Sequence, residues 1–400
     1  MNADSVVLIT KDAMCRSYLP VYGNRYWAGK TPNIDELADK GTVFTACYTA
    51  APSTAMAFLG FCTGKFSFEM EMKNYTPLNE KIRNTIFDYA KELGFESHII
   101  WDTRWMYLAK PYSECYESAT IHTIDNVGQP VGSQFPHNGV LEEDPDKTDT
   151  VIRNVIDTVE SLTASGNKIF LWIHIPHVIN GRVSYGGDID ALDRMIGEIR
   201  RYFKDDKIYI SSDHGNMNGE KGKICYGFDV YETAIRIPLI SPRIGDTAVW
   251  DKPFTSLDLR ELIFQSEIKK RDYIFADSAY YQQPHRKLAI IHGRYKYIYN
   301  KQNDTEELYD VEYDPGESCN LISDDFYDID RRVKTPLREL YFYPFWDELP
   351  EIRKLMREKK DEIWRSETKI EAVKIRLRRF VGRIKRKMII SRRKRKLKRT

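Results

Sequence analysis

Hydrophobic residues in the first two hundred positions follow two patterns that alternate along the chain. Short continuous apolar runs are typical of strands buried on both faces of a sheet, and they occur at residues 6–10, 43–48, 97–100, 168–173 and 207–211. Apolar residues at spacings of three and four predict helices between them, at residues 31–40, 53–64, 82–93, 149–162 and 188–203. Strands that alternate with helices predict an α/β fold with a parallel sheet covered by helices.

After about residue 275 the pattern changes to short strands separated by turn residues. Strands are predicted at residues 287–291, 295–299 and 307–309, and this spacing favours a small antiparallel sheet. From residue 349 onward most residues are good helix formers. We therefore predict three parts: a catalytic α/β/α domain at 1–275, an antiparallel subdomain at 276–345 and a basic amphipathic helical tail at 346–400.

The net charge of +2 conceals a strong asymmetry along the chain. Residues 351–400 hold 22 Lys or Arg against 6 Asp or Glu, whereas the rest holds 39 against 53. An apolar stripe from Ile370 to Met388 lies on an otherwise basic segment, which favours a helix bound to anionic membrane lipids. The alternatives are a helix that packs its stripe on the body and, less favoured, a nucleic-acid contact.

The cysteines and the N-terminus bear on the compartment of the protein. Six cysteines are scattered with no CxxC pair, which argues against a zinc framework or a disulfide scaffold. The N-terminus lacks the features of a secretion signal, and no apolar run approaches the roughly 18 residues that a spanning helix needs. We expect a cytoplasmic protein with reduced thiols, peripheral on the inner membrane face if the tail binds lipid.

Polar residues stand at three points where predicted strands end. Asp12 follows the first strand, Thr54 opens the helix after the second, and Asp213 and His214 follow the strand at 207–211. Since parallel α/β sheets bind ligands beyond the carboxyl ends of their strands, these residues form a candidate divalent-metal site with a hydroxyl nucleophile. Taken singly, each has a structural interpretation as a helix cap or a turn residue.

Several segments, in order, resemble the sulfatase family of the alkaline-phosphatase superfamily. VVLITKD, TPNIDELADKGTVF and the stretch that ends in CTG are similar to the family's first strand, metal aspartate and nucleophile helix. FLWIHIPH, YISSDHGNMNGEKG, VYETAIRIPLISP and EELYDVEYDPGESCNL resemble later segments. The resemblance runs from about residue 5 to 322. It implies a three-layer α/β/α sandwich, like that of alkaline phosphatase, with a small C-terminal antiparallel subdomain.

The resemblance also implies roles for individual residues. Asp12, Asp213 and His214 match metal ligands, and counting back from the family's Thr-Gly places Thr54 at the nucleophile, which is also a ligand. The neighbouring Ser53 is the alternative. Sulfatases carry at this point a Cys or Ser that becomes formylglycine, but the TAMAF segment here lacks that motif, so no formylglycine is expected.

Two departures from the family bear on the metal and the substrate. Ala13 replaces the family's frequent second aspartate, and His214 stands where the last ligand is often Asn. One divalent ion is expected, and the nitrogen ligand favours Mn²⁺ or Zn²⁺ beside the family's Ca²⁺. Because a threonine ester cannot expel sulfate as a formylglycine hemiacetal does, phosphoric esters become candidates beside sulfuric esters.

Four further residues match family positions near the substrate. His177 is expected to contact the substrate or protonate the leaving group, and His174 to bind the substrate. Lys221 is expected to hold an anionic ester oxygen and Arg16 the nucleophile or the substrate anion. Each also has an ordinary structural interpretation, as a buried histidine or a surface cation.

The leading hypothesis is a metal-dependent ester hydrolase that acts on a sulfuric or phosphoric ester of a glycan or a lipid-linked substrate through Thr54. One alternative is a transferase of the phosphoglycerol or phosphoethanolamine type that modifies a surface glycan. The other is a catalytically degenerate binding or scaffold protein, since Ala13 and the missing arginine of the nucleophile motif both depart from the family. The oligomeric state is not indicated.

Overall fold

The structure is a computed structural model of the 400-residue chain. It describes residues 4–26, 28–70, 72–73, 76–77, 82–102, 113–124, 145–175, 189–278, 286–323 and 342–365. The chain forms two compact units, Met1–Leu340 and Tyr341–Thr400. The predicted contacts of His177 and the stripe from Ile370 to Met388 lie outside the described residues.

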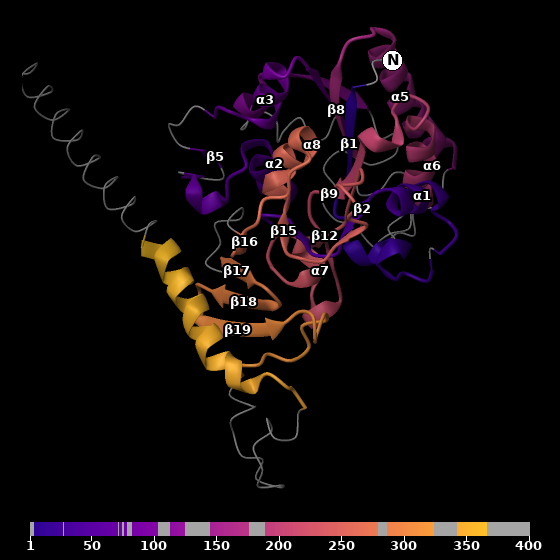
Figure 1. Cartoon of the computed structure of the whole chain (residues 1–400). Helices are drawn as coiled ribbons and strands as arrows, with labels where there is room; N and C mark the ends of the chain where they lie inside the picture. The colour runs from indigo at the N-terminus through magenta and orange to yellow at the C-terminus, as the bar shows by residue number, and fades with distance from the viewer. Residues whose placement is uncertain are drawn as a thin grey trace, which may run out of the picture. The chain divides into compact units, whose positions relative to one another are not determined.

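The larger unit is built around an eight-stranded sheet with helices on both faces (Figure 1). Its strand order is β14-β2-β13-β9-β1-β8-β6-β7. The strands are β1 (Val6–Lys11), β2 (Thr42–Phe44), β6 (Glu96–Asp102), β7 (Ala119–Ile124), β8 (Ile169–Ile175), β9 (Ile208–Ser212), β13 (Leu239–Ser241) and β14 (Val249–Trp250). This arrangement confirms the predicted three-layer α/β/α sandwich.

Alternate residues of β1 pack into two separate hydrophobic cores, because successive side chains of a strand point to opposite faces. Val6 and Leu8 pack with α2 (Thr54–Thr63), α3 (Ile86–Glu92) and α8 (Leu259–Gln265). Val7 and Ile9 pack on the other side with three helices, α1 (Pro32–Lys40), α5 (Pro145–Ala164) and α6 (Ile189–Ile199). Burial on both faces explains the continuous apolar run of the sequence.

Two expectations about the sheet were wrong. The run at 43–48 is divided: β2 joins the large sheet, whereas β3 (Cys47–Tyr48) lies in a three-stranded sheet between β12 (Arg236–Ile237) and β15 (Phe254–Thr255). The large sheet is also not wholly parallel, because β13 pairs antiparallel with both β9 and β2. β13 has only three residues after Pro238, too few to show a strand pattern in the sequence.

The predicted small antiparallel sheet is present beside the large one in the same unit. It runs in the order β16 (Ile274–Asp277), β17 (Lys287–His292), β18 (Tyr295–Asn300) and β19 (Thr305–Asp310). Every neighbouring pair of these strands is antiparallel. The shorter elements are β4 (Met72–Lys73), β5 (Thr76–Pro77), β10 (Met217–Asn218), β11 (Ile224–Cys225) and α7 (Glu232–Ile235).

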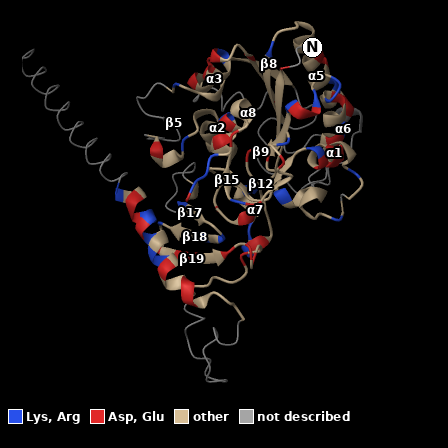
Figure 2. Cartoon of the chain, viewed as in Figure 1, with Lys and Arg blue, Asp and Glu red and all other residues tan. Residues whose placement is uncertain are grey.

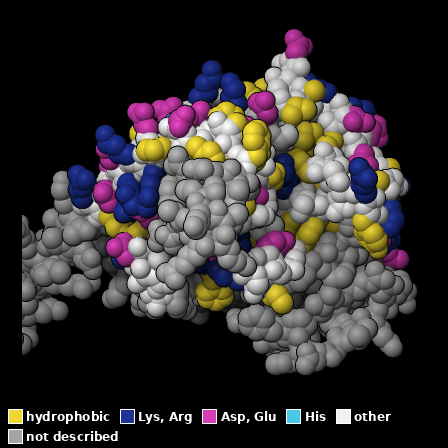
Figure 3. Space-filling model, turned by 90° about the horizontal axis from the view of Figure 1, so that it is seen from below, with side chains coloured by type: hydrophobic (Ala, Val, Ile, Leu, Met, Phe, Trp, Pro, Cys, Tyr) yellow, Lys and Arg dark blue, Asp and Glu magenta, His cyan; other side chains and the backbone are white. Residues whose placement is uncertain are grey.

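Charged residues of both signs alternate along the described chain (Figure 2), and both signs occur on the face seen from below (Figure 3). In the second unit, the helix at residues 349–365 carries 6 Lys or Arg and 4 Asp or Glu, as the mixed colours of Figure 2 show. The excess of positive charge in the tail therefore belongs to residues 366–400, outside the described part. No helix among the described residues is long and apolar enough to cross a membrane.

Candidate functional site

Asp12 lies at the carboxyl end of β1, beside the end of β8. Its backbone N–H donates to the carbonyl of Ile175 (2.9 Å), so the pairing of β1 with β8 continues one residue past the strand. The chain then turns sharply, because Ala13 has a positive φ of 54°, a left-handed conformation that costs a non-glycine residue about 1–2 kcal/mol. The turn directs the N–H of Ala13 to Asp213 Oδ1 (3.1 Å).

Asp213 and His214 follow β9, the other parallel neighbour of β1. Asp213 Oδ1 also accepts a hydrogen bond from the backbone N–H of His214 (2.8 Å). Ser212 ties the two strand ends together, because its hydroxyl accepts from the N–H of Met14 (3.0 Å) and lies 2.7 Å from the carbonyl oxygen of Lys11. These bonds fix the acidic side chains at adjacent strand ends.

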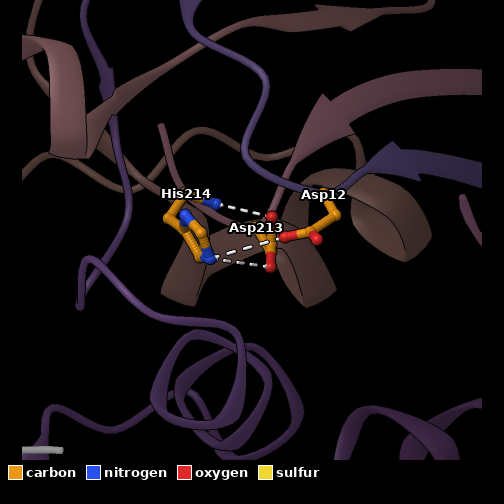
Figure 4. Close-up of side chains that lie close together, drawn as sticks. All are labelled: Asp12, Asp213 and His214. Carbon is orange, nitrogen blue, oxygen red and sulfur yellow. Dashed lines mark hydrogen bonds and ion pairs between the residues drawn. The ribbon is translucent and has the colours of Figure 1, made fainter. Parts of the chain in front are cut away.

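The imidazole of His214 turns Nε2 toward both carboxylates (Figure 4). Its Nδ1 lies 2.7 Å from the carbonyl oxygen of Gly215. Since a carbonyl only accepts, Nδ1 carries a hydrogen, which leaves Nε2 as the ring atom that can act as a metal ligand. Nε2 lies 3.5 Å from Asp12 Oδ1 and 3.4 Å from Asp213 Oδ2. His214 is fully buried, so its position is fixed by packing.

Thr54 brings a hydroxyl to the same point. It is the first residue of α2, a helix in which every residue from Thr54 to Cys62 is buried. Its Oγ1 lies 3.1 Å from His214 Nε2 and 3.4 Å from Asp12 Oδ1. A buried helix holds its first residue rigidly, and its first-turn N–H groups, which lack intrahelical acceptors, favour negative charge there. The hydroxyl can therefore act as a nucleophile on an anionic ester.

Asp12, Asp213 and His214 are suited to hold a metal ion. Their ligand atoms lie within 4.8 Å of one another, and all three residues are buried. Asp213 Oδ2 is buried without a hydrogen-bond partner among the described residues, a costly arrangement unless a cation satisfies it. Two carboxylates and one imidazole form a ligand set that suits Zn²⁺ or Mn²⁺, whereas Ca²⁺ typically binds oxygen ligands only.

Gly215 allows the backbone after His214 to approach a neighbouring segment closely. A Cβ atom at this position would overlap the carbonyl oxygen of Thr233. We expect Gly215→Ala to move His214 and to destabilise the fold by about 1–3 kcal/mol, with weaker metal binding, measured by denaturant unfolding and metal titration. Gly316→Ala is the control, since its Cβ would make only ordinary contact with Ser318. Equal stability of the two variants would contradict the role of Gly215.

Ser53 and His174 lie near this group but are held differently. Ser53 precedes α2, and its buried hydroxyl makes no cap hydrogen bond and has no partner among the described residues. The ring of His174 is fully buried, with Nδ1 2.8 Å from Thr10 Oγ1 and its edge against Phe58. Burial lowers the pKa of His174 to about 3, so the ring is neutral. Their predicted roles in substrate binding stay predictions.

Lys221 and Arg16 make their hydrogen bonds with groups other than the candidate metal ligands. The ammonium of Lys221 donates to the carbonyl of Glu317 and to the hydroxyl of Tyr309 (3.3 Å), which follow or belong to the small sheet. The guanidinium of Arg16 donates to the carbonyl of Thr45 (2.7 Å). The structure thus brings Asp12, Thr54, Asp213 and His214 together, but not these two cations.

Two residues that shape the site gave no clear signal in the sequence. Cys15 Sγ lies 3.2 Å from the carbonyl oxygen of Asn216 and 3.3 Å from that of Thr233. Burial raises the pKa of this thiol to about 11, so it remains a hydrogen-bond donor. The ring of Tyr226 lies 4.5 Å from that of His214. The contacts of Cys15 join segments about 200 residues apart, and that of Tyr226 joins residues about 12 apart. No local sequence pattern indicates either contact.

Comparisons with known proteins agree with this fold. The sequence model of the sulfatase family, described as Sulfatase, matches residues 4–259. A choline-sulfatase of Rhizobium meliloti (strain 1021) is 25% identical over 198 residues, which are 41% of this chain but only 37% of that relative. An arylsulfatase of Clostridium perfringens (strain 13 / Type A) is 22% identical over 84% of this chain and 94% of its own. The phosphonate monoester hydrolase of Agrobacterium radiobacter has a similar fold, with a TM-score of 0.63 and 14% identity over 90% of this chain and 96% of its own.

Proposed function

The chain belongs to the sulfatase family and is an ester hydrolase, and from this premise we propose that it cleaves a phosphoric ester through a covalent adduct on Thr54. The observation that carries this proposal is the place of Thr54 Oγ1, 3.1 Å from His214 Nε2 and 3.4 Å from Asp12 Oδ1. A hydroxyl at a helix N-terminus, next to a group that can hold a cation, is arranged for attack on an anionic ester.

Asp12, Asp213 and His214 would hold a divalent cation, with Thr54 beside it as the fourth oxygen or nitrogen donor. The fit rests on Asp213 Oδ2, which has no hydrogen-bond partner among the described residues, and on His214 Nε2, which faces both carboxylates. When bound, such an ion withdraws charge from an ester oxygen and lowers the pKa of a nearby hydroxyl. Zn²⁺ and Mn²⁺ are the preferred candidates for this ligand set.

The chain's own residues would act in two steps. In the first, Thr54 Oγ1 forms a bond to phosphorus, its proton passes to Asp12 Oδ1, and the bond from phosphorus to the leaving oxygen breaks. The leaving oxygen takes up a proton from solvent, and Asp12 releases its proton to solvent. In the second, water attacks phosphorus, the bond to Oγ1 breaks, and a proton of the water passes to Oγ1, which returns the hydroxyl of Thr54. The N–H groups at the start of α2 would stabilise the negative charge that develops on the phosphoryl oxygens.

The side chain of Thr54 favours phosphorus over sulfur as the centre attacked. A threonine sulfate has no second hydroxyl on the same carbon, so it cannot expel sulfate by breaking the carbon–oxygen bond. Its release would require water to attack sulfur itself. Sulfuric esters remain the second candidate because the curated relatives that match are named choline-sulfatase and arylsulfatase.

Three chromogenic esters of one aryl alcohol would test this proposal: a phosphodiester, a phosphate monoester and a sulfate. We expect faster release of the alcohol from a phosphoric ester than from the sulfate. Intact-mass analysis during turnover of the diester should show an adduct that retains its second ester group. Faster turnover of the sulfate would show that the protein attacks sulfur and not phosphorus. Preferential transfer to added glycerol instead of water would make the protein a transferase.

Removal of the metal should reduce turnover by at least about 100-fold. Dialysis against a chelator should produce this loss, and Mn²⁺ or Zn²⁺ should restore the activity. Asp213→Asn removes one carboxylate ligand while it retains the shape of the side chain, so we expect less bound metal by elemental analysis after purification. The exposed Asp39 provides the control variant, Asp39→Asn. Full activity in a metal-free preparation would contradict metal dependence.

A further inference from the structure

Two arginine side chains converge on one backbone carbonyl at the same edge of the sheet as the candidate active site. Arg16 Nη1 donates to the oxygen of Thr45 (2.7 Å), and Arg236 Nε donates to the same oxygen (2.9 Å). Burial, and next the charge of Arg236, lower the pKa of Arg16, and the charge of Glu232 opposes them only in part. Two cations held this close repel each other, so the arrangement is stable only where negative charge offsets it.

The two guanidinium groups are neutralised unequally. Arg236 forms an ion pair with the buried Glu232, with Nη1 and Oε2 3.0 Å apart. Arg16 has no carboxylate within 4.0 Å among the residues that the structure describes, and Thr45 is the one acceptor that it binds there. A guanidinium has five N–H donors, so most donors of Arg16 are not used by the described protein. Arg16 is half-buried, and its guanidinium lies 5.3 Å from the ring centre of Tyr22.

Arg16 is held at the edge of the sheet that carries the metal ligands. It follows Asp12 by four residues, and the hydrogen bonds of Cys15 to Asn216 and Thr233 fix the segment between them. Thr45 directly follows β2, which ends at the same edge as β1, because β2 and β9 are both antiparallel to β13. β2 is three strands away from β1 in the sheet, or about 14 Å at the usual strand spacing.

We propose that Arg16 binds a second anionic group of the substrate, a carboxylate, sulfate or phosphate separate from the ester cleaved at Thr54. This inference rests on the proposed function, and it makes the substrate at least doubly anionic. The planar fork of a guanidinium matches such groups with two parallel hydrogen bonds. Because Arg16 donates to the residue after β2, and none of its hydrogen bonds among the described residues is to Asp12, Thr54, Asp213 or His214, it suits a group elsewhere on the same molecule better than the reacting ester. Arg16 is thus a specificity residue, separate from the catalytic group.

A pair of non-hydrolysable aryl phosphonates would test this assignment. Both carry a flexible linker able to span about 14 Å, which ends in a carboxylate in one compound and in a neutral carboxamide in the other. Calorimetric titration of the wild-type protein should show about tenfold tighter binding of the carboxylate compound. Arg16→Gln should abolish this preference without weakening the carboxamide compound. Arg16→Lys should retain part of it, because the charge remains but the fork is lost.

Arg243→Gln provides a matched control. Arg243 is an exposed arginine that also donates to backbone carbonyls, those of Asp39 and Lys40, and its loss should leave the preference intact. Equal weakening of both compounds by Arg16→Gln would show a merely structural role and overturn the proposal, as would a wild-type protein that does not discriminate. Titration with inorganic phosphate tests whether Arg16 binds a free anion instead of a group of the substrate. Phosphate binding that requires Arg16, without discrimination between the two linked compounds, would also overturn the proposal.

The kinetics of the corresponding phosphoric esters separate this inference from the proposed function. Arg16→Gln should raise KM for the carboxylate ester about tenfold and leave kcat nearly unchanged. A wild-type protein that turns over neither ester, but still binds the carboxylate phosphonate more tightly through Arg16, would contradict the proposed function alone. Turnover of both esters with equal kcat/KM would contradict the role of Arg16 alone.

Discussion

Thr54→Ala should reduce hydrolysis of every ester substrate by at least about 10³-fold, because it removes the proposed nucleophile and leaves Asp12, Asp213 and His214, the three side chains that could hold a metal. The side-chain contacts that the hydroxyl loses are those with His214 Nε2 and Asp12 Oδ1, so the fold should be little affected. Turnover rates and intact-mass analysis during turnover should together show that both the activity and the covalent adduct are lost. Thr54→Ser should restore both in part, since it retains the hydroxyl.

Two control variants give this result its meaning. Thr63→Ala removes a hydroxyl from the other end of α2, where Oγ1 donates to the carbonyl of Leu59 (2.7 Å), and it should leave activity within about twofold. Ser53→Ala removes the neighbouring hydroxyl, whose position before α2 leaves it without a partner among the described residues. If Ser53→Ala loses the adduct and Thr54→Ala retains full activity, Ser53 is the nucleophile instead of Thr54.

The layered fold could be predicted from the sequence because a strand that is buried on both faces has a continuous run of apolar residues. In β1 the residues from Val6 to Ile9 are apolar at successive positions, and both faces of this strand are indeed covered. The short strand β13 is too short to show such a run. Its three residues are placed by pairing with β2 and β9, which lie about 200 and about 30 residues earlier in the chain. Interactions this distant in sequence decide the direction of β13, and no local pattern contains them.

In the candidate site, the positions of short side chains could be predicted from the sequence, whereas those of long side chains could not. The sequence predicted that Asp12, Thr54, Asp213 and His214 would meet, since a short side chain must lie where its strand or helix ends, and the structure brings their ligand atoms together. The flexible side chain of Lys221 can reach several places from one backbone position. It contacts Tyr309 of the small sheet, and the position of its backbone in the sequence did not indicate that direction.

A buried charge cluster joins the small sheet to the segment that follows the candidate metal ligands. Lys296 of β18 is fully buried, with Nζ 3.0 Å from Glu232 Oε1 and 2.8 Å from Glu317 Oε1. Arg236 and the hydroxyl of Tyr48 contact the other oxygen of Glu232 (3.0 and 3.2 Å). Burial raises the pKa of Glu317 to about 7, against the opposing effect of Lys296. The cluster is balanced only while Lys296 is present.

Lys296→Met should destabilise the fold by about 3–5 kcal/mol, because it leaves two buried carboxyl groups without their shared cation. The loss should grow with pH. The pKa of Glu317 in the folded protein already exceeds the ordinary value of 4.5, and removal of Lys296 raises it further. The protonated carboxyl therefore contributes stability that is fully present below about pH 4.5 and is lost as the pH rises through the folded pKa. Urea unfolding at pH 5 and at pH 8 should show the larger difference from wild type at pH 8.

Lys301→Met is the matched control, since Lys301 is exposed in the turn that follows the same strand. It should change the free energy of unfolding by no more than about 0.5 kcal/mol at either pH. If both variants unfold at the same urea concentration, the cluster contributes nothing to stability. A Lys296→Met protein that is destabilised equally at pH 5 and pH 8 would instead show that packing of the long side chain, and not its charge, holds the small sheet against the segment that follows the metal ligands.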